Sequence, residues 1–162
     1  MSERYEPPSE FLKAIIAEEA TIGTVGHAAE NLNRLIGMTC DEDPANRDWA
    51  TMLLAQEEID TEAVRSALLR AVRDDYDAVR AEALLGLAKR DPALALPYAL
   101  EALEAERASM PVFEAVELIA DPALVPALQP WLDDSENSYI DDRARLAMQA
   151  CVRGASKLRN DC

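Results

Sequence analysis

Apolar residues recur along this chain at the three- and four-residue spacing of amphipathic helices. Between residues 60 and 73 they form one stripe that includes Val64, Ala67, Leu68 and Ala71, with charged side chains on the opposite face. Extending the same test predicts nine helices, over residues 9–20, 24–37, 44–57, 60–73, 77–90, 92–105, 110–120, 122–133 and 138–153. Because the connections are short, neighbouring helices are expected to run antiparallel.

The segment Asp-Pro-Ala-Leu occurs twice, at residues 91–94 and 121–124. Each copy predicts a helix start, because proline in the first turn lacks only a donor that the helix does not use. Pro97 follows the first copy. The sequence leaves open whether it kinks the helix over 92–105 or marks its beginning.

Comparison of the chain with itself indicates a repeat. A shift of 33 residues aligns the segment that begins at Arg47 with the segment that begins at Arg80. An acidic or amide residue also precedes an arginine by six positions in three places: Asp41 before Arg47, Asp74 before Arg80, and Asn137 before Arg143. A repeat of this length is one helical hairpin, which must bury its apolar stripe against neighbouring hairpins.

These features resemble bacterial HEAT-like repeats, in the short form found in phycobilisome-lyase-type repeat proteins. The resemblance covers residues 41–153, whereas residues 9–37 match only by their helix pattern. It implies an all-α fold: a single right-handed α-solenoid domain over residues 1–162, with an irregular N-terminal hairpin at 9–37, clearer repeats at 41–153 and a tail at 154–162. The repeat around 107–120 departs from the pattern, because Arg107 and Phe113 stand where the aspartate and the arginine would be.

The resemblance also implies a structural role for the repeated polar residues. In HEAT-like repeats they form a ladder between successive hairpins, since a guanidinium donates several hydrogen bonds at once to carboxylate and carbonyl oxygens. The expected ladder residues are Asp41, Arg47, Asp74, Arg80 and Arg143.

Composition agrees with helices. Alanine and leucine supply 29 and 20 of the 162 residues, whereas threonine, valine and isoleucine together supply 20. The formal net charge is −15, which disfavours nucleic acid and anionic membrane and suits a protein partner with a basic surface. The polar N-terminal sequence and three cysteines without CxxC spacing predict a cytoplasmic protein.

The acids are concentrated in a few segments. Residues 108–142 contain eight acids and no lysine or arginine. The loops around 41–43, 74–77 and 133–142 are therefore expected to form an acidic ridge, which is either a solvated face or a guide for a basic partner. The candidate partner-binding residues are Trp49, Tyr98, Glu101, Asp133, Asp134, Glu136, Asp141 and Asp142.

The sequence offers little for catalysis. His27 is the single histidine, and neither a nucleophile motif nor a phosphate-binding glycine loop accompanies it. The acidic loops lack the glycine and the distant glutamate of a calcium-binding loop. We therefore expect no catalytic residues, no metal site and no cofactor.

The leading hypothesis is a non-enzymatic protein-binding scaffold or adaptor for a partner with a basic surface, with the oligomeric state left open. One alternative is an acidic inhibitor or immunity-type protein that blocks a basic toxin or nuclease. A second is a repeat enzyme by resemblance, such as a bilin lyase. A repeat enzyme of the DNA glycosylase type is disfavoured, because it would have to hold a DNA duplex in a basic groove, whereas this chain has a net charge of −15.

Overall fold

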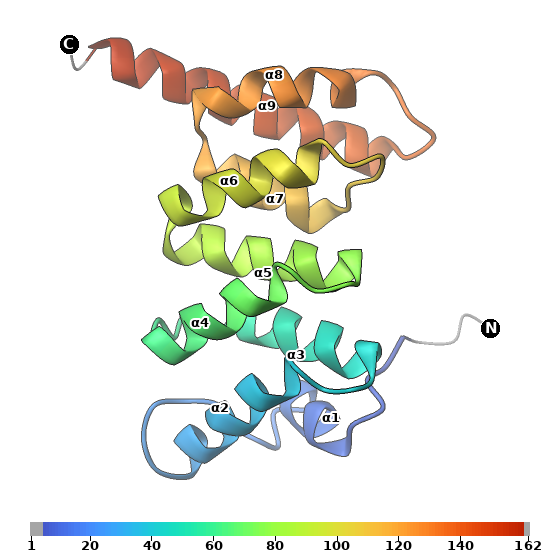
Figure 1. Cartoon of the computed structure of the whole chain (residues 1–162), viewed down its shortest axis with the longest axis vertical. Helices are drawn as coiled ribbons and strands as arrows, with labels where there is room; N and C mark the ends of the chain where they lie inside the picture. The colour runs from blue at the N-terminus through green and yellow to red at the C-terminus, as the bar shows by residue number, and fades with distance from the viewer. Residues whose placement is uncertain (1–4, 161–162) are drawn as a thin grey trace. The chain divides into compact units, whose positions relative to one another are not determined.

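The computed structural model describes the backbone of residues 5–160 and the side chains of residues 5–155. Within these residues all regular secondary structure is helical (Figure 1). The elements are α1 (Glu10–Ile16), α2 (Gly26–Met38), α3 (Pro44–Gln56), α4 (Glu62–Ala71), α5 (Asp77–Arg90), α6 (Pro92–Leu103), α7 (Met110–Ile119), η1 (Pro122–Leu124), α8 (Val125–Leu128), η2 (Gln129–Leu132) and α9 (Ser138–Asn160). Cys162 lies outside the described residues.

The observed helices follow the predicted ranges most closely from 44 to 120, and three predictions are corrected. The helix predicted over 9–20 ends at Ile16, because Glu18 adopts a left-handed conformation with φ of 59°. The helix predicted over 122–133 is divided into η1, α8 and η2. Pro126 and Pro130 lack the N–H groups that a continuous helix would need. The tail predicted from 154 is helical through Asn160, as part of α9.

Pro97 lies inside α6 rather than at its start. The helix begins at Pro92, and the carboxylate of Asp91 accepts a hydrogen bond from the Leu94 N–H at 3.0 Å. This cap satisfies one of the free N–H groups of the first turn. Pro97 has no N–H to donate to the carbonyl of Ala93, so the helix tolerates one missing backbone bond there.

The chain divides into two compact units, Met1–Ala83 and Leu84–Cys162, with the boundary inside α5. A single domain over 1–162 therefore stays a prediction. In the first unit α1 packs against α3, and α2 packs against both α3 and α4. The contacts bury Leu12, Leu35, Leu54 and Leu68 completely. Helices α1 and α2 thus each contact the helix two positions further along the chain.

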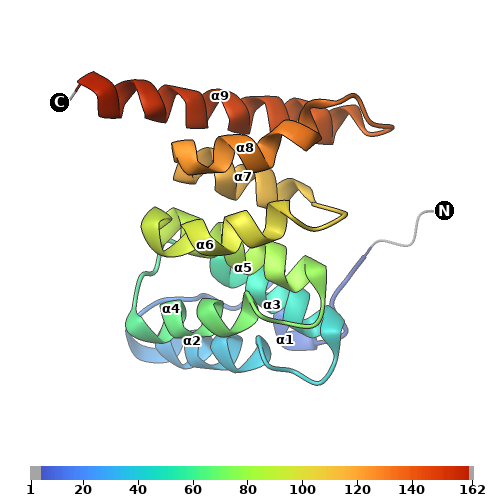
Figure 2. The same ribbon diagram turned by 45° about the horizontal axis from the view of Figure 1, so that its top comes forward.

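The second unit shows the same order of contacts. Helix α7 packs against α6 and α9, and α8 packs against α6 and α9; Figure 2 shows α9 lying along α7 and α8. Phe113, Val116 and Leu128 are fully buried between them. None of the helices in the described part of the chain is both long and apolar enough to cross a membrane.

A close backbone contact fixes α9 against the end of α7. Ala120 terminates α7 with φ of 49°, and its carbonyl oxygen faces Gly154 of α9. A Cβ added at Gly154 would lie 2.1 Å from that oxygen, so only glycine fits.

Candidate functional site

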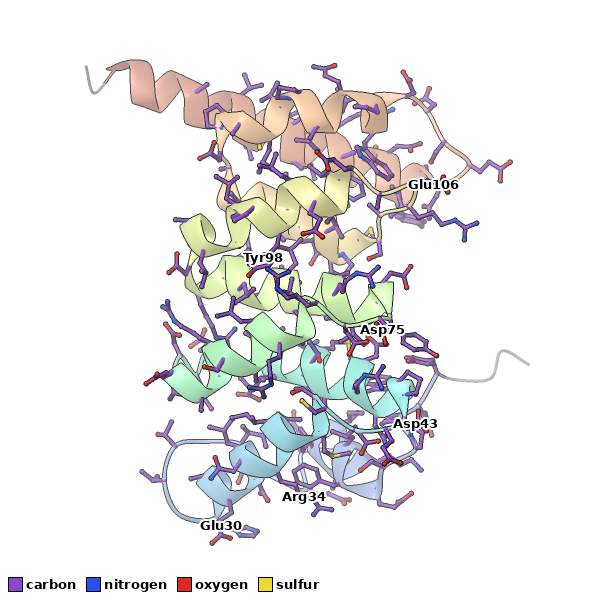
Figure 3. All side chains as sticks on the ribbon, viewed as in Figure 1. Glu30, Arg34, Asp43, Asp75, Tyr98 and Glu106 are labelled. Carbon is purple, nitrogen blue, oxygen red and sulfur yellow. The ribbon has the colours of Figure 1, made fainter. Side chains whose placement is uncertain are left out.

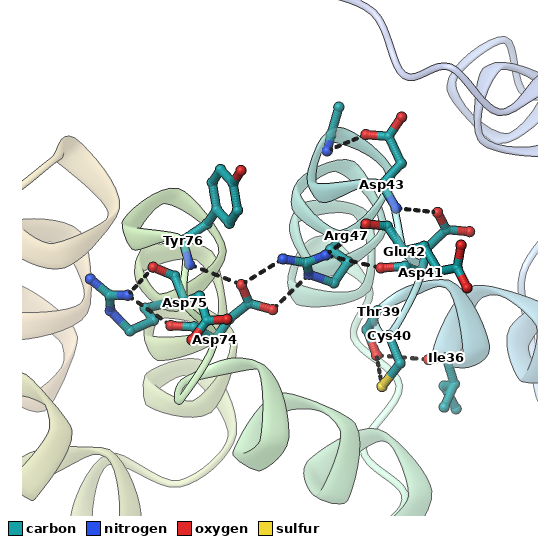
Figure 4. A network of polar contacts seen from close by, with 12 residues as sticks. Ile36, Thr39, Cys40, Asp41, Glu42, Asp43, Arg47, Asp74, Asp75 and Tyr76 are labelled. Atoms are coloured by element: carbon teal, nitrogen blue, oxygen red, sulfur yellow. Dashed lines mark hydrogen bonds and ion pairs between the residues drawn. The ribbon is translucent and has the colours of Figure 1, made fainter.

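Arg47 connects two loops of the first unit (Figure 4). Its Nε and Nη2 donate hydrogen bonds to the two carboxylate oxygens of Asp74, at 2.8 and 3.1 Å. Its Nη1 donates to the carbonyl oxygens of Asp41 and Glu42, at 3.0 and 3.3 Å. The guanidinium therefore holds the loop before its own helix α3 together with the loop before α5.

Arg80 repeats half of this arrangement. Its Nη1 donates to the carbonyl oxygens of Asp74 and Asp75, at 2.7 and 2.9 Å. Asp74 also accepts a hydrogen bond from the N–H of Tyr76 at 2.9 Å. Arg47 and Arg80, with Asp74, thus organise the starts of α3 and α5 through backbone and carboxylate contacts.

The charge of Asp74 is stabilised by these contacts. Burial by itself would raise the pKa of Asp74, but the hydrogen bonds from Arg47 and Tyr76 and the charges of Arg47 and Arg80 bring it below its usual value. The hydrogen bond to Asp74 in turn raises the pKa of Arg47. The pair is ionised at neutral pH.

Asp41 uses its side chain differently from Asp74. Its carboxylate accepts hydrogen bonds from the Asp43 N–H at 2.9 Å and from the Asn46 Nδ2 at 3.2 Å. Asn46 is buried, and its Oδ1 accepts a hydrogen bond from the Ser9 N–H at 3.0 Å. An amide therefore connects the first loop to the start of α1, a role that the sequence analysis did not assign to Asn46.

Arg143 contacts helix side chains rather than a loop, which differs from its expected place in the ladder. Its guanidinium forms ion pairs with Glu114 and Glu117 of α7, at 3.3 and 3.5 Å. Phe113, at the position of the missing arginine, is fully buried and contacts Trp131 edge to face. The indole N–H of Trp131 donates to the Leu103 carbonyl at 3.0 Å. Aromatic packing occupies this repeat position in the second unit.

The Arg47–Asp74 contact brings two acidic loops together. We call the carboxylates of these loops the acidic edge. Glu42, Asp75 and Asp77 are exposed, whereas the other members are half-buried. Asp43 and Asp75 lie on the same side of the first unit (Figure 3). The members of the acidic edge are Asp41, Glu42, Asp43, Asp74, Asp75 and Asp77.

A groove lies next to the acidic edge. Its volume is about 230 Å³, and Tyr5, Asp48 and Tyr76 line it together with Pro44, Ala45, Ala78 and Val79. The Tyr5 hydroxyl donates to Asp48 at 2.9 Å, and its ring stacks on Trp49 with centroids 5.6 Å apart. Tyr5 was not singled out from the sequence, because nothing in its local pattern places the segment before α1 against α3.

Two ionisable groups of the groove have shifted pKa values. Burial, followed by the contact with Asp48, raises the pKa of Tyr5 to about 12. Burial also raises the pKa of Asp48; the hydrogen bond from Tyr5 opposes this effect, and the nearby charge of Asp77 adds to it. Asp48 is therefore a carboxylate whose charge is poorly compensated.

Trp49 is half-buried beneath Tyr5. Its indole nitrogen is buried and has no hydrogen-bond partner within the described residues. The structure therefore places Trp49 in packing contact, beside the groove rather than among its lining residues.

The acids near the start of α9 do not form one uniform surface. Asp133, Asp134, Glu136 and Asp142 are exposed, and Arg145 forms ion pairs with Asp134 and Asp142. Asp141 is buried and accepts hydrogen bonds from the N–H and the hydroxyl of Ser135, at 3.0 and 2.6 Å. These hydrogen bonds lower the pKa of Asp141 despite some desolvation. As a correction to the sequence analysis, Asp141 orders its own loop and is not available to a partner.

The remaining predicted residues lie apart from these loops. Tyr98 of α6 is half-buried (Figure 3). Glu101 of the same helix is exposed. His27 is exposed and lies 2.9 Å from Glu30 on the same turn of α2. Among the described side chains, no group of three acids, cysteines or histidines is arranged to hold a metal ion.

Comparison with known proteins gives information on the fold alone. No known protein-family model matches the sequence. No curated protein matches it either. Among solved structures, the X-ray structure of the E. coli protein YibA is similar, with a TM-score of 0.59 and 18% sequence identity. The match covers 86% of this chain and 54% of the YibA chain, so this protein spans about half the length of its structural neighbour.

Proposed function

We propose that this protein is a HEAT-like α-solenoid that acts as a non-enzymatic scaffold and binds a protein partner with a basic surface. The order of helix contacts supports the solenoid, because α1 packs against α3 and α2 against α4 in the first unit, and α6 packs against α8 and α7 against α9 in the second. The arginine contacts of the first unit support the HEAT-like assignment, since Arg47 bonds to its own loop and to the following one. The free thiols of Cys40 and Cys151 support a cytoplasmic location.

The acidic edge is the observation that carries the proposal. Exposed carboxylates are common, but here two loops hold them in a fixed arrangement through the contacts of Arg47 and Arg80. Preorganised charges lose little conformational entropy on binding. They also increase the association rate of an oppositely charged protein. A lysine- or arginine-rich surface is the complement of this edge.

The test compares two pairs of charge-neutralising substitutions. Glu42→Gln with Asp75→Asn removes two exposed carboxylates of the acidic edge without removing a side chain that bonds Arg47. Glu30→Gln with Glu62→Gln removes two exposed carboxylates of the same unit elsewhere. Each variant and the wild type are used for affinity purification from the native cell, and the retained proteins are quantified by mass spectrometry.

We expect a basic protein to be retained by the wild type and by the control pair. Its recovery should fall about tenfold with the acidic-edge pair, which corresponds to about 1.4 kcal/mol for two partly screened charges. It should also fall when the ionic strength is raised to about 0.5 M, where the Debye length is only a few Å. Equal recovery by both pairs of variants, or retention of acidic proteins only, would contradict the proposal.

The same experiment distinguishes the inhibitor hypothesis. A retained partner that is a nuclease or toxin would be assayed with one equivalent of the purified chain. Stoichiometric loss of its activity favours an inhibitor, whereas unchanged activity favours a scaffold. The acidic edge is relevant to both, because closely spaced carboxylates also resemble a phosphate backbone.

A further inference from the structure

The groove beside the acidic edge has the size of one side chain rather than of a small-molecule ligand. Its volume of about 230 Å³ is below the range of about 300–1,000 Å³ that is usual for ligand pockets. The lining combines the rings of Tyr5 and Tyr76 with one carboxylate, that of Asp48, and with apolar atoms of Ala78 and Val79. Aromatic rings and a carboxylate are the groups that bind a cationic side chain.

Asp48 and Asp74 are a natural comparison within one unit. Both carboxylates are partly buried, but Asp74 has Arg47 at 2.8 Å and a lowered pKa. Asp48 has the hydroxyl of Tyr5 as its hydrogen-bond donor. Within the described residues Asp48 forms no ion pair, and no positive charge is among the causes of its pKa shift. A cation in the groove would form with Asp48 the kind of ion pair that Arg47 forms with Asp74.

The charges around the groove also favour a cation. The charge of Asp77 raises the pKa of Asp48, and the charge of Asp43 raises the pKa of Tyr5. Both effects disfavour a further negative charge in the groove. Arg47 approaches the ring of Tyr76, with its Cζ 5.4 Å from the ring centroid, but its charge is matched by Asp74. Figure 4 shows the Tyr76 ring extending away from the hydrogen-bonded loop. The negative charges that act on Asp48 and Tyr5 therefore favour a cation in the groove.

We propose that the groove lined by Tyr5, Asp48 and Tyr76 receives one arginine or lysine side chain of the basic partner. The inference rests on the proposed function, because it identifies the anchoring point of the same interface. The cation contacts the tyrosine rings and forms an ion pair with Asp48, while the acidic edge attracts the surrounding basic residues. In such an interface one enclosed side chain contributes more than the exposed charges around it.

The test uses a blocked pentapeptide with one central arginine between glycines, a lysine analogue, and a citrulline analogue that has the same shape without the charge. Binding is followed in low salt by amide NMR shifts of the wild type, of Asp48→Asn and of the control Glu62→Gln. Asp48→Asn keeps the volume and an acceptor for the Tyr5 hydroxyl, and Glu62 is an exposed acid of the same unit that does not line the groove.

We expect the arginine or the lysine peptide to shift the amides of Tyr76, Ala78 and Val79. Asp48→Asn should weaken this binding about tenfold, whereas Glu62→Gln should change it less than twofold. Equal binding of the citrulline peptide, or equal binding by Asp48→Asn, would overturn the groove assignment.

The two proposals fail in different ways. If the groove assignment is wrong but the scaffold is right, the partner recovered from cells binds the wild type and Asp48→Asn equally and stays sensitive to salt. If the scaffold proposal is wrong, no basic protein is recovered, whatever the peptides do.

Discussion

Replacement of Arg47 by alanine is the sharpest test of how the first unit is held together. The substitution removes two charge-assisted hydrogen bonds to Asp74 and two hydrogen bonds to the carbonyls of Asp41 and Glu42. It removes the cation that is hydrogen-bonded to Asp74 and leaves the charge of Arg80 nearby, although only 12% of the Asp74 side chain is exposed to water. The free energy of unfolding should therefore fall.

The expected size follows from this burial. Breaking a buried ion pair by removing one partner costs about 3–5 kcal/mol. The Arg47 and Asp74 side chains retain 15% and 12% exposure, so water recovers part of the loss. We expect a decrease of about 3 kcal/mol, the lower end of that range. For a urea m-value of about 2 kcal/mol/M, the unfolding midpoint should decrease by about 1.5 M.

The assay is urea unfolding followed by the fluorescence of Trp49, in a Trp131→Phe background so that the signal reports the first unit. The matched control is Arg65→Ala. Arg65 also forms two hydrogen bonds to one carboxylate, that of Asp60, at 2.7 and 2.8 Å, but the two side chains are 35% and 39% exposed. An exposed pair of this kind contributes about 0.5 kcal/mol, so the control midpoint should decrease by about 0.25 M.

The pH dependence gives a second measurement on the same variants. The folded-state pKa of Asp74 lies below its usual value, so its stabilisation is complete above that usual value and is lost as the pH falls through the folded pKa. The difference between wild type and Arg47→Ala should therefore shrink in acid. An Arg47→Ala midpoint equal to the wild type at pH 7, or as small a change as that of Arg65→Ala, would refute the reasoning.

The other expected outcomes concern single positions. Gly154→Ala should lower the unfolding midpoint of the second unit, because the new Cβ would lie 2.1 Å from the Ala120 carbonyl oxygen. Gly37→Ala should instead raise the free energy of unfolding by about 0.5–1 kcal/mol, because Gly37 of α2 faces open space. Thermal melting curves of the two variants test this pair. Asp48→Asn should stabilise the protein at pH 7. The folded-state pKa of Asp48 is raised, so the wild type loses stability as the pH rises through the titration of Asp48. The gain from the substitution should therefore vanish in acid, which thermal unfolding measured against pH tests. Cys151 should resist iodoacetamide until urea unfolds the second unit, because it is fully buried and its pKa is raised to about 11; peptide mass spectrometry of the labelled protein measures this.

The helices were predictable because their apolar spacing is regular over several turns. The exceptions have local causes that periodicity does not contain. Residues 122–133 keep an apolar stripe, but prolines at every fourth position break the hydrogen-bonding pattern into short pieces. Helix α1 ends early through a left-handed residue, Glu18, which no turn signal in the sequence announces.

The site was predictable only where it repeats. The spacing of Asp74 and Arg80 occurs more than once, which made Arg47 and Asp74 stand out from other charged residues. Asn46 and Tyr5 each act through one long-range contact, and a single sequence carries no signal for such a contact. The sequence did contain a signal that Asp141 is buried while Asp142 is exposed, because Asp141 shares a helix face with the buried Ala144 and Cys151.

Phe113 has a consequence for how the protein could be lengthened or shortened by design. In a 33-residue copy of 42–74, Arg47 would donate to the carbonyl of the residue before the segment, as it does to Asp41, and the Asp74 carbonyl would accept from the arginine of the next segment, as it does from Arg80. A segment built around Phe113 has no such arginine, and its junction depends on matching the volume of Trp131 instead. Module exchange should therefore succeed near Arg47 and fail near Phe113.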